Sequence, residues 1–401
     1  HYPLRRQRQM CIRDRTNKIQ KTESKTMSDN QVKSGNFRLY SYPLKNSIKQ
    51  YDSKRYKRVV FIGSNNFEGK IDPEIHPIKN RFQENRSISI GGIAAAKSYL
   101  DIFRQSYPNE TIYVDAGSIL TANLSAHKTF FYMNYLNLDV LGLGLNEVLF
   151  SQNHRKAKSL KNLRKKSNFE IISSNLSYLV SNKQLDQYGI ATNSIKEVNG
   201  VKVGFISVLT QDLSNKISDK DINGLHIENP ARSIILNSNI LRRKGAQIII
   251  LLANQGIDCT SKEAAEDDIH PLKVNFYPGK DDFCAKENNK LYEVLSKIPK
   301  TSIDLIFTSG NKSKVVNYIN KFPVIQNPGE GKYLSWAEVF FDTKHQKIDS
   351  GKTVIHQPVQ LCHQFFKDHQ DCFTAEGIEN KELMPAFFMG VEVDIKEIPK
   401  K

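Results

Sequence analysis

Short apolar runs alternate with segments of helical periodicity from Val59 onward, and this alternation constrains the fold more than any other feature of the sequence. Runs of β-branched and aromatic residues are typical of buried strands, whereas apolar residues spaced three and four apart predict amphipathic helices. This order of segments indicates an α/β fold. We predict strands at Val59–Gly63, Thr111–Asp115, Leu138–Gly142, Phe169–Ser173, Val201–Thr210, Gln247–Leu252 and Ile303–Thr308, and helices at Gly92–Tyr107, Ala126–Asn137, Pro230–Lys244 and Asn288–Ile298.

Two further segments predict antiparallel pairs. Asn199-Gly200 separates the apolar runs Ser194–Val198 and Val201–Val208, and Asn-Gly supplies the two positive φ values of a type I′ hairpin turn. We expect a second antiparallel pair between Pro323–Gln326 and Tyr333–Asp342. Hairpins combined with strand-helix alternation predict a sandwich with mixed sheets.

The positive charge is concentrated at the N-terminus. Residues 1–58 contain 16 Lys or Arg and four Asp or Glu, which supplies +12 of the formal net charge of +16. Because this segment has almost no apolar periodicity, we predict that residues 1–56 form a disordered basic tail. Residues 1–16 also resemble translated adapter sequence, so their native origin is open. The rest of the chain is nearly neutral, and we do not expect nucleic acid to be its partner.

Cysteine usage bears on the compartment. No apolar run of about 18 residues occurs, so we expect no membrane-spanning helix, and no apolar signal-peptide core follows the basic start. An even set of cysteines in two local pairs suits two disulfides of an exported periplasmic or extracellular protein, and four free thiols are the alternative. Apart from Cys11 in the tail, these cysteines are Cys259, Cys284, Cys362 and Cys372.

Several motifs follow one another in an order that is specific in combination. They are Gly91–Ala94, Tyr113–Gly117, Leu138–Gly144, Ser174–Leu176, Val198–Gly204, Ile303–Ile306, Pro323–Gln326 and Gly331–Leu334. In this order they resemble the metallophosphoesterase (calcineurin-like) domain of the 5′-nucleotidase family. Cys259, Cys284 and the segment Pro358–Cys362 resemble the exported bacterial members of that family.

The resemblance implies an architecture. It predicts a four-layer α-β-β-α sandwich of two mixed sheets. The metallophosphoesterase-like domain would span residues 57–345, and residues 346–401 would form an extension or linker. In the family, a second domain that binds the nucleotide base follows at that point.

The family binds two divalent metals through carboxylates and imidazoles, and this chain departs from that pattern in its first loops. The Asp-x-His loop of the family corresponds to Asn66 and Glu68, and the bridging Asp corresponds to Ser118. Asn and Ser oxygens are poor substitutes for carboxylate and imidazole ligands, so both changes weaken metal binding.

The remaining motifs change in the same direction. The Gly-Asn-His-Glu loop becomes Gly144–Glu147, which puts Leu145 at a ligand position and Asn146 at the catalytic histidine. Asn254 replaces a histidine after the central strand, and Gly310 and Lys312 replace two more. An amide cannot shuttle a proton, and an ammonium repels a metal ion.

Two substituted positions suggest an internal replacement for a metal. Glu68 and Lys312 correspond to family residues that bind the same ion, so we predict an ion pair between them. Weak metal candidates remain at Glu68, Asp115 and Glu147, although no cofactor is expected at these positions.

Two functions follow from the resemblance. The first is a catalytically inactive protein that acts in binding or scaffolding, with a phosphate-bearing small molecule as a ligand near Lys312. The second is a phosphoesterase that hydrolyses nucleotides with Zn or Mn bound by altered ligands around Glu68, Asp115, Glu147 and Asp139. The sequence indicates no oligomeric state.

Overall fold

The structure is a computed structural model of the 401-residue chain. It describes residues 41–42, 50–78, 86–121, 126–152, 162, 164–178, 189–210, 225–257, 289–310, 312–320, 322–367, 372 and 382–399.

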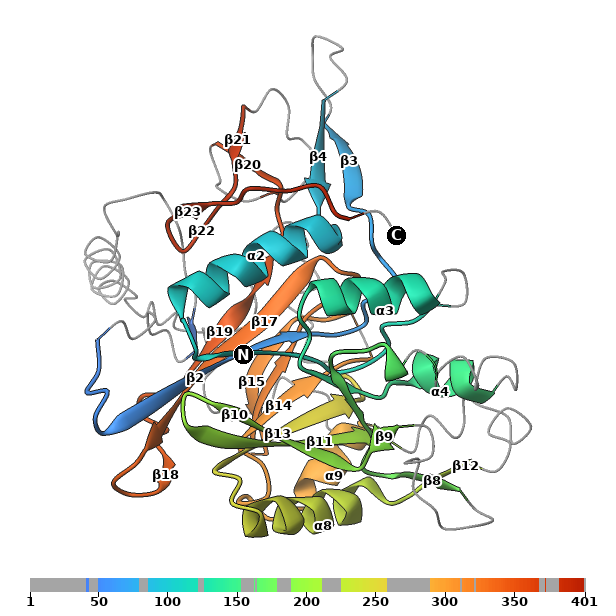
Figure 1. Cartoon of the computed structure of the whole chain (residues 1–401), viewed down its shortest axis with the longest axis vertical. Helices are drawn as coiled ribbons and strands as arrows, with labels where there is room; N and C mark the ends of the chain where they lie inside the picture. The colour runs from blue at the N-terminus through green and yellow to red at the C-terminus, as the bar shows by residue number, and fades with distance from the viewer. Residues whose placement is uncertain are drawn as a thin grey trace, which may run out of the picture. The chain divides into compact units, whose positions relative to one another are not determined.

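The larger sheet has nine strands (Figure 1). Strands β2, β5, β6, β7 and β9 run parallel, whereas β17 is antiparallel to both β2 and β19. The order across the sheet is β1 (Ser41–Tyr42), β19 (Val354–Gln360), β17 (Tyr333–Asp342), β2 (Tyr56–Ser64), β5 (Thr111–Asp115), β6 (Val140–Gly142), β7 (Glu170–Ile172) and β9 (Ile190–Ala191), with β18 (Lys347–Ile348) paired to β17.

The second sheet has six strands. Its four inner strands run parallel, and an antiparallel strand flanks them on each side. The order is β10 (Asn193–Val198), β11 (Val201–Leu209), β13 (Ile248–Asn254), β14 (Leu305–Thr308), β16 (Phe322–Gln326) and β15 (Val315–Ile319). The predicted hairpin between β10 and β11 is confirmed, with φ values of 51° at Asn199 and 74° at Gly200.

One predicted strand pair is wrong. The segments Pro323–Gln326 and Tyr333–Asp342 are both strands, but they lie in different sheets. β16 pairs with β14 and β15, while β17 pairs with β2 and β19. Both segments are apolar because each is buried among neighbours in its own sheet, and apolar periodicity does not identify the partner strand.

The two sheets face each other across a common apolar core. Phe61 and Val114 of the larger sheet and Phe205 and Leu252 of the smaller sheet belong to one buried cluster. The sheets approach so closely at Gly63 that a Cβ there would lie 2.4 Å from the ring of Phe307. The mixed α/β fold predicted from the sequence is therefore confirmed.

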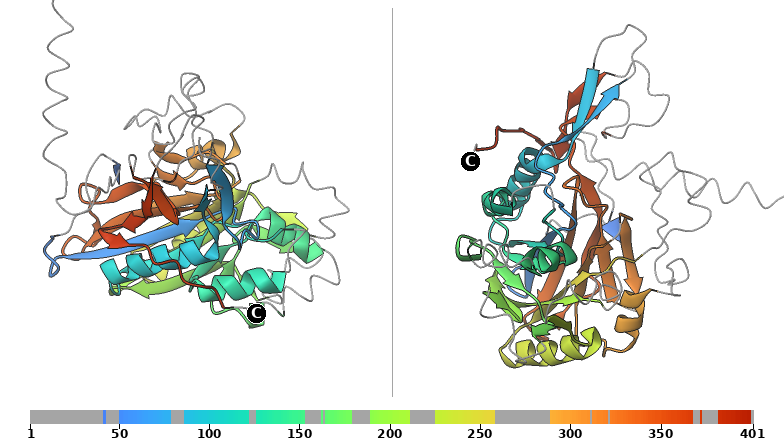
Figure 2. Two further views of the ribbon diagram at one scale, coloured as in Figure 1. Left: turned by 90° about the horizontal axis from the view of Figure 1, so that it is seen from above. Right: turned by 90° about the vertical axis from the view of Figure 1, so that its right-hand side faces the viewer.

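The helices pack on the outer faces of the sheets. Apolar residues of α8 and α9 share a buried cluster with the face of β11 and β13 that points away from the larger sheet. On the larger sheet, α2 lies over β17 and β19 (Figures 1 and 2). Phe103 of α2 contacts Trp336 of β17 with ring centroids 5.2 Å apart. The helices among the described residues are α2 (Gly92–Ser106), α3 (Ala126–Tyr135), α4 (Leu145–Gln152), α8 (Pro230–Arg243) and α9 (Lys290–Ser296).

Four small two-stranded sheets complete the described structure. They pair β3 (Glu74–Ile78) with β4 (Arg86–Ile90), β8 (Leu176–Tyr178) with β12 (Leu225–Ile227), β20 (Gln364–Phe366) with β21 (Leu383–Pro385), and β22 (Phe387–Phe388) with β23 (Val391–Glu392). Within the described ranges, no helix has the length and apolar character needed to cross a membrane.

We expected residues 346–401 to form an extension or linker, but described segments within this range pack against the rest of the chain. β19 is a strand of the nine-stranded sheet, and Phe388 contacts Tyr99 and Phe103 of α2. A disulfide joins Cys362 and Cys372, as predicted for this pair. Cys259, Cys284 and most of the predicted tail lie outside the described residues.

A buried charged cluster lies on the face of the larger sheet covered by α2. The guanidinium of Arg58 donates to Glu110 at 2.7 Å and to Glu338 at 3.1 Å. Glu338 also contacts Nε2 of His356 at 2.9 Å, and the His356 ring stacks on Trp336 with centroids 3.4 Å apart. Burial lowers the pKa of His356, so this cluster is held together mainly by Arg58 and its two carboxylates.

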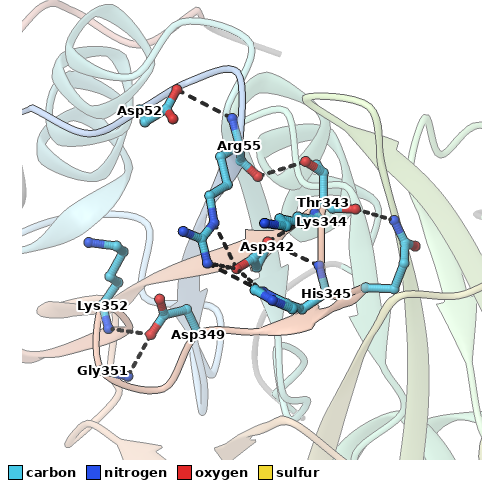
Figure 3. A network of polar contacts seen from close by, with 10 residues as sticks. Asp52, Arg55, Asp342, Thr343, Lys344, His345, Asp349, Gly351 and Lys352 are labelled. Carbon is cyan, nitrogen blue, oxygen red and sulfur yellow. Dashed lines mark hydrogen bonds and ion pairs between the residues drawn. The ribbon is translucent and has the colours of Figure 1, made fainter.

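A second network fixes the start of β2 to the end of β17 (Figure 3). Arg55 donates from Nε and Nη2 to Asp342 at 3.1 and 2.7 Å, and Asp342 also accepts from the backbone of Lys344 at 2.9 Å and of His345 at 3.1 Å. These bonds lower the pKa of Asp342 well below its usual range. The network joins segments far apart in sequence at the end of β2 opposite Ser64.

Candidate functional site

The carboxyl ends of β2, β5 and β6 meet the carboxyl ends of β13 and β14. Hydrogen bonds cross between the two sheets here, because Ser309 Oγ donates to the carbonyl of Ala116 at 2.9 Å and Gly310 N donates to Asn66 Oδ1 at 2.7 Å. Parallel strands place the loops that follow them at one edge. The substituted positions identified in the sequence therefore come together in three dimensions.

Asn254 lies at the centre of the site and binds three other loops. Its Nδ2 donates to Ser118 Oγ at 3.3 Å and to Ser309 Oγ at 2.5 Å, and its Oδ1 accepts from Leu145 N at 3.1 Å. Asn254, Ser118 and Ser309 are all buried. Both functional ends of the amide are therefore engaged within the protein, and the amide nitrogen has no lone pair for a metal.

Asn66 links the first loop to its neighbours. Its backbone has a φ of 46°, a left-handed conformation that Asn tolerates better than most residues. Its backbone N donates to the Gly117 carbonyl at 3.0 Å, and its carbonyl accepts from Glu330 N at 2.8 Å. The side chain accepts from Gly310 N and donates to Glu68 Oε1 at 3.4 Å. The residue at the first ligand position thus holds loops together.

The Glu147 carboxylate is enclosed by backbone donors. Oε2 accepts from Ser118 N and Gly144 N, and Oε1 accepts from Leu120 N, each at 2.9 Å. The side chain is fully buried in the first turn of α4, where the helix dipole favours a negative charge. Burial raises the pKa of Glu147, and the three N–H groups oppose that shift.

Asp115 is the second buried carboxylate of the site. Ser64 Oγ donates to Oδ2 at 2.5 Å, and Gly117 N donates to Oδ1 at 2.7 Å. Ser64 Oγ also lies 2.7 Å from the hydroxyl of Tyr113. Complete burial, reinforced by the negative charge of Glu147, raises the pKa of Asp115 to about 7.

This raised pKa predicts a pH-dependent stability that Asp115→Asn removes. The folded protein holds the proton up to about pH 7, whereas the unfolded chain releases it near the ordinary aspartate pKa of 3.8. The contribution of this proton to the free energy of unfolding is therefore favourable at low pH and is lost as the pH rises from about 4 toward 7, by on the order of 4 kcal/mol. An amide can donate to Ser64 Oγ and accept from Gly117 N, so Asp115→Asn should fold.

Urea unfolding at pH 5 and pH 8 tests this prediction. Asp115→Asn should match the wild type at pH 5 and exceed its stability at pH 8. An Asp115→Asn protein that is less stable than the wild type at both values would show that Asp115 is ionised throughout this range.

The predicted ion pair between Glu68 and Lys312 is wrong. The Lys312 ammonium pairs with Glu330, whereas Glu68 accepts a hydrogen bond from Asn66. Glu68 raises the pKa of Lys312 only as a more distant charge. Lys312 turns toward the loop before β17 because Glu330 offers a carboxylate there, and the sequence does not show that turn.

The remaining predicted positions have structural contacts. Asn146 Nδ2 donates to the carbonyl of Leu120 at 2.7 Å. Asp139 accepts from Tyr113 N at 2.9 Å at the amino end of β6, so it lies away from the loops of the site. Among the described residues, no group of three or more His, Cys, Asp or Glu side chains is arranged to hold a metal ion.

Four further residues belong to the site, and the sequence analysis did not assign them a role there. Ser64 donates to Asp115 and lies against the Tyr113 hydroxyl, Ser309 anchors Asn254, and Glu330 binds Lys312. Ser64 and Ser309 each follow directly after or end an apolar strand, which is a usable signal. Glu330 stands between two glycines in a loop, and its role depends on the turn conformation.

Comparison with curated proteins gives one partial relative. No family model matches the chain. The chain is similar to Cell wall protein Lmo0130 of Listeria monocytogenes, with 24% identity over 172 residues. The match covers 43% of this chain and only 20% of that protein.

Solved structures give a clearer result for the fold. The structure resembles a 5′-nucleotidase precursor from Thermus thermophilus, with a TM-score of 0.55 and 16% identity over 76% of this chain and 55% of that chain. It also resembles the calcineurin-like phosphoesterase YfkN from Bacillus subtilis, with a TM-score of 0.56 and 16% identity over 76% of this chain and 91% of that chain. The protein therefore has the metallophosphoesterase fold of the 5′-nucleotidases.

Proposed function

We propose that the protein is a non-catalytic relative of the 5′-nucleotidases that acts in binding or scaffolding. The observation that carries this proposal is the buried network around Asn254, which joins Ser118, Ser309 and Leu145 by hydrogen bonds. A two-metal site needs carboxylates and imidazoles directed at one point. At this point the Asn254 amide binds the hydroxyls of Ser118 and Ser309 and the backbone N–H of Leu145.

Proton transfer is also unsupported by the residues present. The family's catalytic histidine corresponds to Asn146, whose amide donates to a backbone carbonyl. An amide neither gains nor releases a proton near neutral pH, so it cannot protonate a leaving oxygen. The loss of both functions favours binding over hydrolysis.

The alternative phosphoesterase would have to use Glu68, Asp115, Glu147 and Asp139 as ligands for Zn or Mn. The oxygens of Asp115 and Glu147 accept hydrogen bonds from Ser64 and from four backbone N–H groups. Asp139 lies at the other end of β6. Metal binding by this set would require both carboxylates to give up these bonds.

We further propose that the protein is exported. The Cys362–Cys372 disulfide is typical of proteins that fold outside the reducing cytosol, and the similar Listeria protein is named as a cell wall protein. Treatment of intact producing cells with a membrane-impermeant protease tests this proposal. Digestion, or recovery of the protein from the medium, would support export, and protection inside the cells would contradict it.

Nucleotide turnover tests the proposed lack of catalysis. The purified full chain should hydrolyse AMP and bis(p-nitrophenyl) phosphate near pH 7 no faster than the buffer does, with or without added Mn²⁺ or Zn²⁺. An active 5′-nucleotidase in the same buffers is the positive control. Metal-dependent hydrolysis by the wild type that disappears in Glu147→Gln would support the phosphoesterase instead.

A further inference from the structure

A turn with an unusual backbone places a carboxylate beside the site. Gly329, Glu330 and Gly331 have φ values of 76°, 57° and 64°, so Glu330 adopts a left-handed conformation that favours glycine. The turn is fixed against the first loop, because Glu330 N donates to the Asn66 carbonyl at 2.8 Å. A Cβ at Gly329 would lie 2.7 Å from the Cβ of Asn66, so this contact needs glycine.

The Glu330 carboxylate is shared by two lysines. Oε1 pairs with the Lys312 ammonium, and Oε2 pairs with the Lys332 ammonium at 2.8 Å. The two ammonium groups lower the pKa of Glu330 to about 2. Lys332 also pairs with Glu74, which in turn contacts His76. The lysine pair therefore surrounds one carboxylate as it would surround a bound anion.

Stability alone does not explain this arrangement. The Lys312 side chain is 66% exposed, so its charge is solvated and needs no partner for burial. The Lys332–Glu330 pair, with side chains 21% and 18% exposed, is the part of the arrangement that stabilises the turn. The pair with the exposed Lys312 contributes little to folding, while the left-handed backbone of Glu330 is unfavourable for a residue with a side chain. The second pair, with the exposed Lys312 at a strained residue, is therefore what indicates a function for the Glu330 side chain.

We propose that Lys312 and Lys332 form a binding site for a small oxyanion and that Glu330 closes this site as a tethered internal anion. Ammonium groups bind phosphate and carboxylate oxygens as point charges. A carboxylate on a fixed turn competes at a high effective concentration, so the wild-type protein binds external anions weakly until Glu330 is displaced. This inference deepens the proposed binding function by naming the ligand class, and it requires no metal.

Isothermal titration of three proteins with inorganic phosphate tests the proposal, at low ionic strength and with EDTA present. Glu330→Gln should bind phosphate at least about tenfold more tightly than the wild type, because the closed form no longer reduces the apparent affinity. Glu382→Gln is the matched control, since it removes a carboxylate from the exposed Lys367–Glu382 pair. It should bind phosphate no better than the wild type.

Lysine substitutions and a second probe complete the test. Adding Lys312→Met or Lys332→Met to Glu330→Gln should reverse the gain in affinity. Titration with a glutamate-rich peptide shows whether phosphate or a partner's carboxylate is bound more tightly. If Glu330→Gln folds poorly, Glu330→Asn provides a variant that tolerates positive φ. Equal affinities of the wild type and the opened variant for both probes would overturn the proposal, as would a gain that survives the loss of both lysines.

Because the titrations contain EDTA, the measured phosphate affinities do not depend on bound metal, and they are independent of the test of catalysis. Hydrolysis by the metal-loaded wild type bears on the proposed lack of catalysis and does not alter the affinities measured here. An unchanged affinity in Glu330→Gln rejects the lysine site and leaves the absence of turnover as it stands.

Discussion

Glu147→Ala is expected to lower the free energy of unfolding by about 3 kcal/mol or more. The substitution removes the acceptor of three buried N–H groups, those of Ser118, Leu120 and Gly144. A buried donor left without a partner costs about 1–3 kcal/mol, and the lost side-chain volume adds to the cost. Urea unfolding at pH 7 measures the effect.

Two variants make the Glu147 result specific. Glu397→Ala removes an exposed carboxylate and should change stability by less than about 0.5 kcal/mol. Glu147→Gln keeps one acceptor oxygen and should fall between the wild type and Glu147→Ala. A loss below about 1 kcal/mol in Glu147→Ala would mean that water replaces the carboxylate and that the interior of the site is open to solvent.

Glu338→Ala is expected to cost about 3–5 kcal/mol, because it leaves Arg58 with one carboxylate in a buried position. It also removes the partner of His356 Nε2. Chemical denaturation at pH 7 measures the loss. Most of this loss comes from the Arg58 charge that remains buried without Glu338. The loss of stability in Glu338→Ala should therefore be larger than the net stability that the intact cluster contributes.

A double substitution distinguishes the cost of an unpaired Arg58 from the net contribution of the intact cluster. Arg58→Met combined with Glu338→Leu removes the Arg58–Glu338 pair and leaves Glu110 with its hydrogen bonds from Tyr51 and Asn199, so it should recover most of the stability lost in Glu338→Ala. The effects of the single substitutions should therefore not be additive. Strict additivity would contradict direct coupling of Arg58 and Glu338 in the buried cluster.

Local sequence signals predicted much of the fold. The strand at Thr111–Asp115 and the Asn199-Gly200 hairpin follow from alternation and turn chemistry, which act between near neighbours. The partners of β16 and β17 were mispredicted because pairing depends on contacts between distant segments. β19 (Val354–Gln360) was also missed, since it lies within residues 346–401, for which the resemblance implies an extension or linker.

The sequence predicted which residues lie in the site better than it predicted their hydrogen-bond partners. Motif order located Asn66, Ser118 and Asn254, and the structure brings them together. Which donor meets which acceptor depends on the distance between the two sheets, so the bonds of Asn254 to Ser118 and Ser309 could not be derived from the chain. Lys312 was assigned to Glu68 because the left-handed turn at Glu330 has no clear sequence signature.

Metal stoichiometry tests most directly whether hydrogen bonds around Asn254 stand in place of a two-metal centre. The full chain is produced with added Mn²⁺ and Zn²⁺, dialysed against metal-free buffer and measured by plasma mass spectrometry. We predict well under one bound ion per chain for each metal. Two tightly bound ions per chain that are lost in Asp115→Asn and Glu147→Gln would contradict this interpretation of the site.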